Sequence, residues 1–559
     1  MKVLVMLNFR VVTAACLAML SWQSVQAQSS GPSAADVQRS IEQNRPDLNR
    51  TAPKPAAKLP AAPVTYDQGF ARLKEVKVQS ALFQQELANY WKDAINKPVS
   101  AQKLTDFKAK AWELFQSKGY LAYISTSAQA TPEGSVLTVL VSMPVVGKVT
   151  VLPVDAETVS REYVNEVARR FKEIYPTGTP VDVHGFEAQL NAAAYDLPVD
   201  LEISLRQVDS KAVDVTIHLR RAEAQVGKVL GGFVQGNNYG LQQFGRTQVL
   251  GNVRVQGFTP SSELALTTQI SQGVGYYRAE YEAPVIGTGM HWRTYGSQVH
   301  SYAKGVQGLS EEVGLGLNKL LQTDRSGRWI SGVELSKRQA QNWTSGVATA
   351  NRIDHQLRVK LRGESSKDWV DNFYNEFTLI SGNINLDRNT PDMVDDSNNR
   401  RVAGNYQKLE TNGGLSQVLD KDRYVTGSMR WRAQTASKNL DTYNKISMGG
   451  VNGIRALTSL DGVGDQGAQL SFDIIHQAIP TAWGGLFYDI GVVKSNKFEA
   501  NNPGYVTLEG AGWQVGGKEG VVTWSLSVGK FFGKTTNSWT PTNTQNGDWR
   551  GNFAVTHSF

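Results

Sequence analysis

Cysteine and long apolar runs are almost missing from this chain of 559 residues. Cys16 is its one cysteine, and it lies in a predicted signal segment described next, so an internal disulfide and a zinc–thiolate site are excluded from the mature chain. Beyond residue 27 no apolar run reaches the length of about 18 residues that a membrane-spanning helix needs. The seven histidines are scattered without metal-ligand spacing, and neither a G-x-S-x-G motif nor a P-loop lysine occurs. We therefore expect no metal, no cofactor and no enzymatic activity.

Residues 1–27 have the order of a secretory signal. Lys2 and Arg10 come before the apolar stretch "VVTAACLAMLSW", and small Ala27 closes the segment. This order predicts export and cleavage after Ala27, which would also remove Cys16. Losing two of the 58 basic residues and none of the 51 acidic ones lowers the net charge from +7 to +5. So small a surplus on so long a chain does not indicate nucleic-acid binding.

The mature chain would begin with a short helix on a tether. Residues 28–49 are mostly polar, and Ala34, Val37 and Ile41 recur at spacings of three and four, which predicts an amphipathic helix. Residues 50–67 include "TAPKPAAKLPAAP", in which four of thirteen residues are proline. Such a composition favours an extended linker. We therefore expect the helix to be tethered and not to belong to a domain core.

Two successive segments, residues 68–145 and 146–223, carry the same order of predicted elements. The first has a strand-like "LKEVKVQ", a helical "SALFQQELANYWKDAI" and a second helix between the capping residues Ser100 and Gly119. The alternating runs "YLAYISTS" and "SVLTVLVSM" follow as two strands. The second segment has the strand "GKVTVLP", one helix, a shorter helix and two alternating strands. The sequence thus predicts two βααββ units in tandem.

Helical periodicity disappears from residues 224–559. Alternating segments near ten residues long, such as "YYRAEYEAPV", "GGLFYDIGVV" and "VVTWSLSVGK", are separated by clusters of Gly, Asn, Asp and Ser. Strands can cross a membrane only as a closed barrel, because every backbone group must be paired there. At about 20 residues per strand and connection, this region predicts a transmembrane antiparallel β-barrel of about 16 strands. A soluble propeller or solenoid is the alternative, but no fixed repeat is found.

The chain ends in "GNFAVTHSF", another alternating segment. Phe553, Val555 and Phe559 share one face of this predicted strand, and the chain stops on an aromatic residue. We interpret these three residues as the terminal signal of a barrel strand. Upstream, the acidic cluster "DMVDDSNN" that starts at Asp392 lacks the spacing of an EF-hand. We expect it to be a solvated extracellular loop.

One stretch, "GVGDQG", matches the G-x-G-x-x-G pattern of a dinucleotide-binding turn. Such a site needs its glycines between a strand and a helix, so that the pyrophosphate lies on the helix N-terminus. Here the stretch leads into "AQLSFDIIHQAI", where Leu470, Phe472 and Ile474 alternate as in a strand. We therefore predict a glycine-rich loop without a cofactor.

The longer stretch "GGVNGIRALTSLDGVGDQG" resembles the sixth extracellular loop of the two-partner secretion transporters. These are the outer-membrane members of the Omp85 superfamily that export haemolysins and large adhesins. The family has an aromatic residue two positions after its arginine, where this chain has Leu457. The matching residues are Gly449, Gly450, Gly453, Ile454, Arg455, Ala456, Gly464, Asp465 and Gly467. A companion F-x-D-x-G motif on a later strand is similar to Phe487, Asp489 and Gly491.

The resemblance follows the mature chain in order: a plug helix, a linker, two POTRA domains and a barrel whose loop 6 covers about residues 436–468. In the family this loop folds back into the barrel and its arginine pairs with the aspartate of the strand. The resemblance therefore implies a conformational lock between Arg455 and Asp489. Parity along "LFYDIGVV" agrees, because it puts Asp489 on the face opposite Leu486 and Tyr488, which would meet lipid.

The function that the resemblance implies is transport across the Gram-negative outer membrane, with the POTRA domains in the periplasm. The partner would be one secreted exoprotein, such as a haemolysin, adhesin, contact-dependent toxin or haem-binding protein, moved to the cell surface without ATP. We also expect contact with outer-membrane lipid and lipopolysaccharide, help from the barrel assembly machinery and periplasmic chaperones during biogenesis, and a monomeric state. An Omp85-type insertase, a passive pore and a surface enzyme of the barrel-phospholipase kind remain alternatives.

Overall fold

The computed structural model describes residues 33–44, 68–154, 159, 161–197, 199–208, 211–221, 230–259, 262–324, 327–367, 370–387, 390–497, 504–533 and 544–559. The predicted signal with its cleavage after Ala27, the linker at 50–67 and both ends of the predicted helix at 28–49 lie outside these residues. The described residues fall into two compact units. One holds the two predicted βααββ segments, and the other holds helix α2 (Ala34–Asn44) with the barrel strands.

The first βααββ segment forms a three-stranded sheet covered by helices. Its elements are β1 (Leu73–Gln79), α3 (Gln84–Asn89), the 3-10 turn η1 (Lys92–Ala94), α4 (Ala101–Ser117), β2 (Tyr123–Thr131) and β3 (Gly134–Ser142). The strand order is β1-β3-β2, with β1 parallel to β3 and β2 antiparallel to it. Ser100 caps α4, because its side chain accepts a hydrogen bond from the Lys103 amide at 3.1 Å.

The predicted first helix of this segment is wrong in its length. Instead of one long helix, the chain forms α3 and the turn η1. The break turns Trp91 into the core, where it is 1% exposed and its ring lies 5.0 Å from that of Phe107. Tyr90 also reaches Phe107, at 5.2 Å. A continuous helix would carry these two neighbouring aromatic side chains on different faces, so the contact of both with Phe107 favours the break.

The second βααββ segment repeats the arrangement. Its elements are β4 (Val145–Pro153), α5 (Arg161–Ile174), α6 (Val183–Asp196), β5 (Val199–Gln207) and β6 (Ala212–Arg221), with the strand order β4-β6-β5. Helix α6 has 14 residues and is as long as α5, so the prediction of a shorter helix is wrong. Its last residue, Asp196, accepts two hydrogen bonds from Arg170 of α5, at 3.0 and 2.7 Å, and this ion pair holds the helix end.

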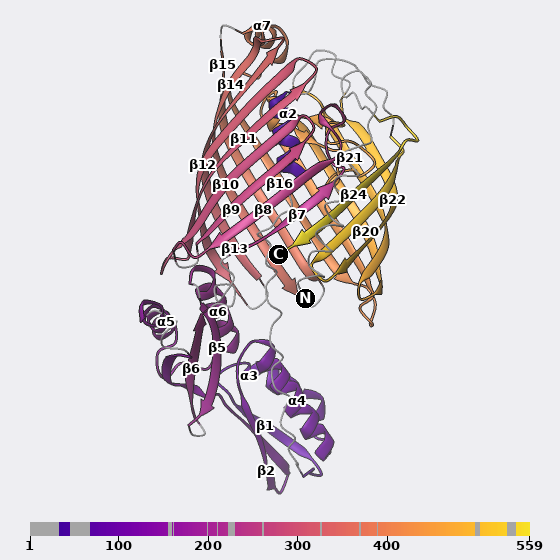
Figure 1. Cartoon of the computed structure of the whole chain (residues 1–559). Helices are drawn as coiled ribbons and strands as arrows, with labels where there is room; N and C mark the ends of the chain where they lie inside the picture. The colour runs from indigo at the N-terminus through magenta and orange to yellow at the C-terminus, as the bar shows by residue number, and fades with distance from the viewer. Residues whose placement is uncertain are drawn as a thin grey trace. The chain divides into compact units, whose positions relative to one another are not determined.

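Sixteen strands close a barrel in chain order, and β24 pairs with β7 in antiparallel fashion (Figure 1). The strands are β7 (Leu230–Asn237), β8 (Gln248–Gln256), β9 (Glu263–Ser271), β10 (Val274–Val285), β11 (Met290–Ala303), β12 (Val306–Thr323), β13 (Gly327–Thr344), β14 (Val347–Lys367), β15 (Val370–Leu386), β16 (Gly404–Val418), β17 (Val425–Ala436), β20 (Gln466–Ile479), β21 (Ala482–Lys494), β22 (Val506–Glu519), β23 (Val522–Phe531) and β24 (Trp549–Ser558). The predicted antiparallel barrel of about sixteen strands is confirmed.

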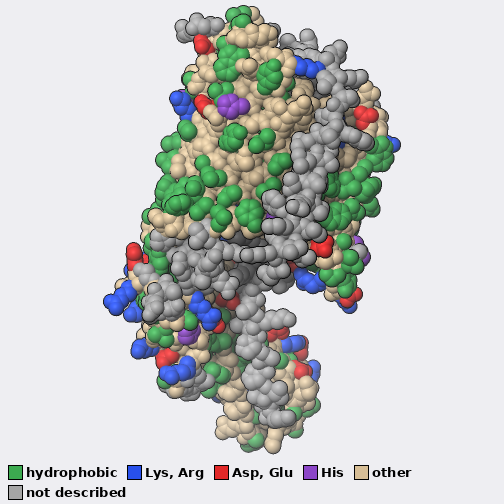
Figure 2. All heavy atoms as spheres, viewed as in Figure 1, with side chains coloured by type: hydrophobic (Ala, Val, Ile, Leu, Met, Phe, Trp, Pro, Cys, Tyr) green, Lys and Arg blue, Asp and Glu red, His purple; other side chains and the backbone are tan. Residues whose placement is uncertain are grey.

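Alternation along the strands separates an apolar outer face from a polar lumen. Figure 2 shows hydrophobic side chains over the outer face of the barrel. Soluble proteins rarely expose so many large apolar side chains, whereas a barrel in lipid requires them. Exposed apolar residues of β12–β16 include Val313, Leu315, Leu317, Val333, Leu335, Leu357, Val359, Leu361, Phe377, Leu379 and Leu409. Among the helices of the described residues, none combines the length and the apolar character needed to cross a membrane.

The two ends of the barrel sequence meet at the β24–β7 seam. The terminal residue Phe559 exchanges backbone hydrogen bonds with Gly232 of β7, at 3.0 and 3.1 Å. Phe553 and Val555 alternate along β24 with Ala554, which is buried, while Phe559 is half exposed. The predicted barrel-signal residues therefore lie on the closing strand or directly after it.

The acidic cluster after β15 is not the solvated loop that we expected. It forms the short helix α7 (Pro391–Asp395) and the turn η4 (Asp396–Arg400), in which Asp392 and Asp396 are buried. Arg352 of β14 donates two hydrogen bonds to the Asp392 carboxylate, at 2.7 and 2.6 Å. The prediction failed because this arginine lies 40 positions away and reaches the cluster only through the pairing of β14 with β15.

Candidate functional site: a loop and a helix inside the barrel

The segment between β17 and β20 folds back into the lumen as a compact loop. It contains the turn η5 (Thr442–Asn444) and a two-stranded ribbon of β18 (Ile446–Ser447) and β19 (Val463–Gly464). Between the ribbon strands, the Ile454 amide donates to the Met448 carbonyl at 2.7 Å. "GVGDQG" ends this loop and leads into strand β20, which excludes the strand-to-helix turn of a dinucleotide site.

Two glycines allow the tight turn at the loop tip. Gly450 has a φ of 109°, a conformation that side chains with a Cβ atom rarely adopt. A Cβ atom on Gly453 would lie 2.3 Å from the Met448 carbonyl oxygen, so only glycine fits there. The other glycines of the predicted motif also lie in close-packed surroundings: Gly449, Gly464, Gly467 and, on the facing strand, Gly491.

The loop tip buries an apolar cluster against the barrel wall. Ile454, Ala456 and Leu457 are fully buried, and they pack with residues of β21–β23, namely Val493, Leu508 and Phe531. Leu457, which replaces the aromatic residue of the family motif, lies inside this cluster. Burial of each such large apolar side chain contributes about 1.5–3 kcal/mol, so this cluster stabilises the position of the loop tip on the barrel wall.

Arg455 points from this loop into a pair of carboxylates on the wall. Its Nη2 and Nε atoms donate to Asp489 of β21 at 2.7 and 3.0 Å, and its backbone amide donates to the same carboxylate at 2.9 Å. Asp489 is fully buried and Arg455 is 3% exposed. The guanidinium also lies 3.7 Å from the ring centroid of Phe487. The two residues of the predicted lock, Arg455 and Asp489, thus meet in the lumen, and Phe487 of the predicted barrel-wall motif lies against the same guanidinium.

A second carboxylate at this point was missed from the sequence. Asp473 of β20 accepts a hydrogen bond from Arg455 Nη1 and another from Gln514 at 2.7 Å. Asn552 of β24 donates to the Arg455 carbonyl at 2.9 Å. Parity along "AQLSFDIIHQAI" could have placed Asp473 on the polar face with Gln469, but nothing in the sequence showed that this face meets the loop.

Asp465 holds the C-terminal root of the loop. Its carboxylate accepts hydrogen bonds from the Leu440 amide at 3.0 Å and the Lys497 amide at 2.7 Å, and it pairs with Lys445 at 3.1 Å. The residue is completely buried. It therefore joins the two ends of the inserted loop to the segment after β21, a task different from that of the Arg455 contacts.

Helix α2 also lies within the barrel unit and contacts both the wall and the inserted loop. The Ser33 hydroxyl accepts from the Asp36 amide at 3.2 Å, and the Ser33 amide donates to the Asp36 carboxylate at 3.0 Å, which caps the helix start. On the loop side, Arg39 donates to the Thr442 carbonyl of η5, and Ser40 bonds with Ser459 at 2.7 Å. The helix is thus fastened to the loop as well as to the strands.

Glu312 of β12 joins the helix, the loop and the wall. Its carboxylate accepts from Gln38 of α2 at 3.1 Å, from Tyr443 of η5 at 3.1 Å and from Tyr295 of β11 at 2.9 Å. At the C-terminal end of α2, Glu42 accepts from Tyr276 of β10 at 2.6 Å. These contacts are polar, so displacement of the helix would expose groups that water can solvate in turn.

The lumen-facing residues of β10–β14 form a network of ion pairs, here called the charged wall. Glu334 of β13 is 3% exposed and is bound by Arg293 of β11 and by Arg358 and Lys360 of β14, the last two at 2.7 and 2.9 Å. Further pairs in this wall join Arg278 with Glu280 and Arg338 with Asp354. Each buried charge here has a partner, as low-dielectric surroundings require.

The ionisable side chains around the loop tip form ion pairs with one another. In the described part of the chain no group of three or more His, Cys, Asp or Glu side chains is placed to hold a metal ion. Arg455 pairs with both Asp489 and Asp473, and Asp473 also pairs with Arg430 of β17 at 3.5 Å. The arrangement resembles a latch: one guanidinium, two carboxylates and an aromatic ring that close on an inserted segment.

Comparison with known proteins identifies the fold. No family model matches the sequence, and no curated protein matches it. CdiB from Escherichia coli is similar in structure with a TM-score of 0.62 and 15% sequence identity, over 95% of this chain and 100% of that chain. CdiB from Acinetobacter baumannii gives a TM-score of 0.59 and 14% identity over the same shares of the two chains. The chain therefore has the fold of these two proteins along nearly its whole length, and at such identities the likeness shows the fold alone.

Proposed function

We propose that this protein is an outer-membrane transporter that takes up one large secreted protein in the periplasm and moves it to the cell surface. The observation that carries the proposal is the filling of the barrel by two segments, helix α2 and the loop with Arg455, that are attached to the wall but are not strands of it. A barrel whose obstructions can be displaced suits a conduit that is closed at rest. The absence of a P-loop from the sequence suits transport without ATP.

The likeness to the two CdiB structures supports the proposal at the level of architecture, because it extends over the βααββ segments as well as the barrel. The loop motif around Arg455 supports it at the level of residues, since it resembles that of the two-partner secretion transporters. A simple pore requires neither feature.

Capture of the partner would use the sheets of the βααββ segments. In both sheets the strand antiparallel to its neighbour is an edge strand: β2 in the order β1-β3-β2 and β5 in the order β4-β6-β5. Addition of an extended segment to such an edge gives affinity through main-chain hydrogen bonds, with modest demands on side chains. Ser204 of β5 offers a position for testing this contact, because its side chain lies on an exposed part of the strand.

The resting state would be held by the latch at Arg455. Its release requires that a buried guanidinium leave both Asp489 and Asp473, and removal of one partner from such a pair costs about 3–5 kcal/mol. A free-energy cost of this size keeps the loop bound inside the barrel but still allows its release. Binding of the partner would have to supply the difference.

The experiment compares proteins released into the medium by cells that carry the wild-type chain, no chain, or a variant. Variants are a deletion of residues 70–221, Arg455→Ala and Asp489→Ala. Arg328→Ala is the matched control, because it breaks an Arg–Glu pair of 2.8 Å on β13 and β14 away from the loop. We expect a secreted partner to appear with wild type and the control, to vanish with the deletion, and to fall together in the two latch variants.

The alternatives give different results. An insertase would leave the medium unchanged but lower the amounts of other barrel proteins in the outer membrane. A passive pore would keep its conductance after deletion of residues 70–221. If the medium of wild-type cells and cells without the chain is the same, transport of a secreted partner is refuted.

A further inference from the structure

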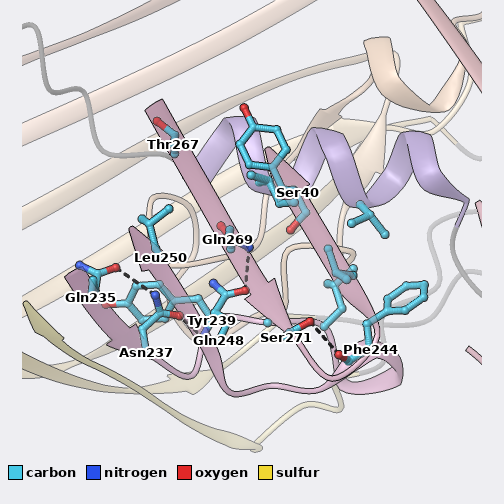
Figure 3. A pocket seen from close by; sticks show the side chains of 16 residues that line it. Ser40, Gln235, Asn237, Tyr239, Phe244, Gln248, Leu250, Thr267, Gln269 and Ser271 are labelled. Atoms are coloured by element: carbon cyan, nitrogen blue, oxygen red, sulfur yellow. Dashed lines mark hydrogen bonds between the residues drawn. The ribbon is translucent and has the colours of Figure 1, made fainter. Parts of the chain in front are cut away.

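Two cavities of the lumen share part of their walls and lie along the seam where the barrel closes. One has a volume of about 340 Å³ and is lined by residues of β7, β22, β23 and β24 and by the turn at Pro480 and Thr481. The other, of about 30 Å³, lies beneath helix α2 against β7–β10 (Figure 3). Gln235 and Tyr239 line both cavities. Together the two spaces follow the seam from one end of the barrel toward the helix.

The chemistry of this path is uniform. Of the described residues that line the two cavities, Lys518 is the one charged side chain. The others offer amides, hydroxyls and apolar groups. We call the following set the neutral track: Gln235, Asn237, Tyr239, Gln248, Gln269, Thr523, Ser525 and Thr556.

Side-chain hydrogen bonds join members of the track in two groups, and one of these groups crosses the seam. Gln269 of β9 donates to Gln248 of β8 at 2.8 Å, a bond that Figure 3 shows together with the bond from Asn237 to Gln235 at 2.9 Å. Gln235 then donates to Thr556 of β24 at 2.9 Å, so the ladder crosses the seam. Neutral amides and hydroxyls of this kind can exchange partners with an extended backbone of any sequence, because each group both donates and accepts.

Helix α2 covers the upper part of the track with apolar side chains. Val37 and Ile41 line the smaller cavity, and they pack with Leu241, Phe244 and Val274. The polar bonds of α2 described above go instead to β10, β12 and the loop, through Gln38, Arg39 and Glu42. Displacement of α2 would therefore uncover the track without breaking the hydrogen-bond ladder that forms it.

A rival path through the lumen has a different character. A cavity of about 450 Å³ lies between the C-terminal end of α2 and β16–β20. Charged side chains line it, namely Glu42, Glu410, Arg430 and Arg432. Fixed charges in confined surroundings bind opposite charges strongly and repel like ones, so such a path would favour some sequences and hold others back.

We infer that the exported polypeptide crosses the barrel in extended form along the neutral track, entering at the 340 Å³ cavity and displacing Val37 and Ile41 of α2 from its upper end. This inference rests on the proposed function and specifies its route. The track accepts the backbone of the exported chain and stays indifferent to its side chains.

The test uses the full-length chain and the secreted partner that the release experiment identifies. The partner carries one cysteine and, at its C-terminal end, a stably folded domain that arrests it in the barrel. Because the predicted mature chain lacks cysteine, each variant adds a unique thiol. Gln235→Cys and Thr556→Cys probe the track, and Asn412→Cys probes the rival cavity. We expect disulfide cross-links to the arrested partner at Gln235 and Thr556, several-fold stronger than at Asn412.

A second measurement uses charge instead of cross-linking. Thr556→Lys places a fixed cation on the track, and Asn412→Lys places one in the rival cavity. We expect export of the partner to slow several-fold in the first variant and to change little in the second, at equal amounts of folded barrel. If the stronger cross-links or the larger slowing occur at Asn412, the route along the track is refuted, but the transport function is not. If wild type releases no partner, transport and track fall together.

Discussion

The two sides of the lumen solve the problem of a polar interior in opposite ways. The charged wall of β10–β14 compensates every buried charge with a counter-ion, as Glu334 does with Arg293, Arg358 and Lys360. The neutral track uses amides and hydroxyls, such as Gln248 with Gln269, and leaves two cavities beside them. A network of fixed charges resists rearrangement, whereas neutral groups can exchange partners at small cost.

Helix α2 and the inserted loop contact the two sides of the lumen in different ways. Helix α2 directs Gln38 toward Glu312 of the charged wall and its apolar side chains Val37 and Ile41 toward the track. Arg39 and Ser40 bond with the loop. The loop instead packs its tip on β21–β23 and fixes Arg455 to β20 and β21. The comparison teaches that the charged wall is an anchor and the track is the side that can open.

The largest effect is expected on the charged wall. Glu334→Gln leaves Arg293, Arg358 and Lys360 without their shared carboxylate, which should lower the free energy of unfolding of the barrel by about 3–5 kcal/mol. The measurement is the denaturant midpoint of the purified protein in detergent. The matched change on the track is Gln248→Leu, for which the midpoint should move far less. Equal losses would show that the two sides are not different in kind.

The second-largest effect is expected at the latch. Its two carboxylates should differ in how strongly they are coupled to Arg455. Asp489 receives three hydrogen bonds from Arg455, one of them from the backbone, while Asp473 shares the guanidinium with Gln514. Double-mutant cycles should therefore give a coupling free energy of about 2–3 kcal/mol between Arg455 and Asp489. The coupling between Arg455 and Asp473 should be about 1 kcal/mol. Unfolding midpoints of single and double variants supply both values, and a larger coupling to Asp473 contradicts the predicted lock.

The third prediction compares the contacts that hold helix α2 on the charged wall with those that hold it on the track. Glu312→Gln weakens the charge-assisted hydrogen bond that Gln38 of the helix donates to the wall, and it should favour the displaced helix by about 2 kcal/mol. Val37→Ala removes two methyl groups from the side of the helix that faces the track, and it should favour the displaced helix by about 1.5 kcal/mol. Open probability in planar bilayers measures both, since about 1.4 kcal/mol is tenfold. A closed channel in Glu312→Gln would show that this anchor is not what holds the helix.

The sequence was sufficient for the architecture and for one pair of site residues. Period-two alternation predicted a barrel, because an apolar outer face must repeat at every second residue in lipid, and the length of the region predicted about sixteen strands. The loop motif brought Arg455 and Asp489 to notice, and the structure puts their charged atoms 2.7 Å apart. The role of this pair as a lock stays a prediction.

What the sequence could not supply were contacts between distant segments. Gln38 and Glu312 are 274 positions apart, and Asp473 joins the latch only through the register of β20 with β21. The charged wall has the same origin: alternation put charges on the inner face, but only strand order decides which arginine meets which glutamate. The break in the first helix of the βααββ segment likewise depended on burial of Trp91, which local periodicity does not report.

The smallest expected effect lies in the ladder of the track itself. Gln269→Leu removes the hydrogen bond to Gln248, whose carbonyl then faces a cavity that water can enter, so stability should fall by about 1 kcal/mol or less. Transport should suffer more than stability, because the exported backbone loses a group with which it can exchange hydrogen bonds. The two readouts are the denaturant midpoint and the rate at which the partner appears in the medium. A large loss of stability with unchanged export would make the ladder a structural element of the barrel and would remove it from the route.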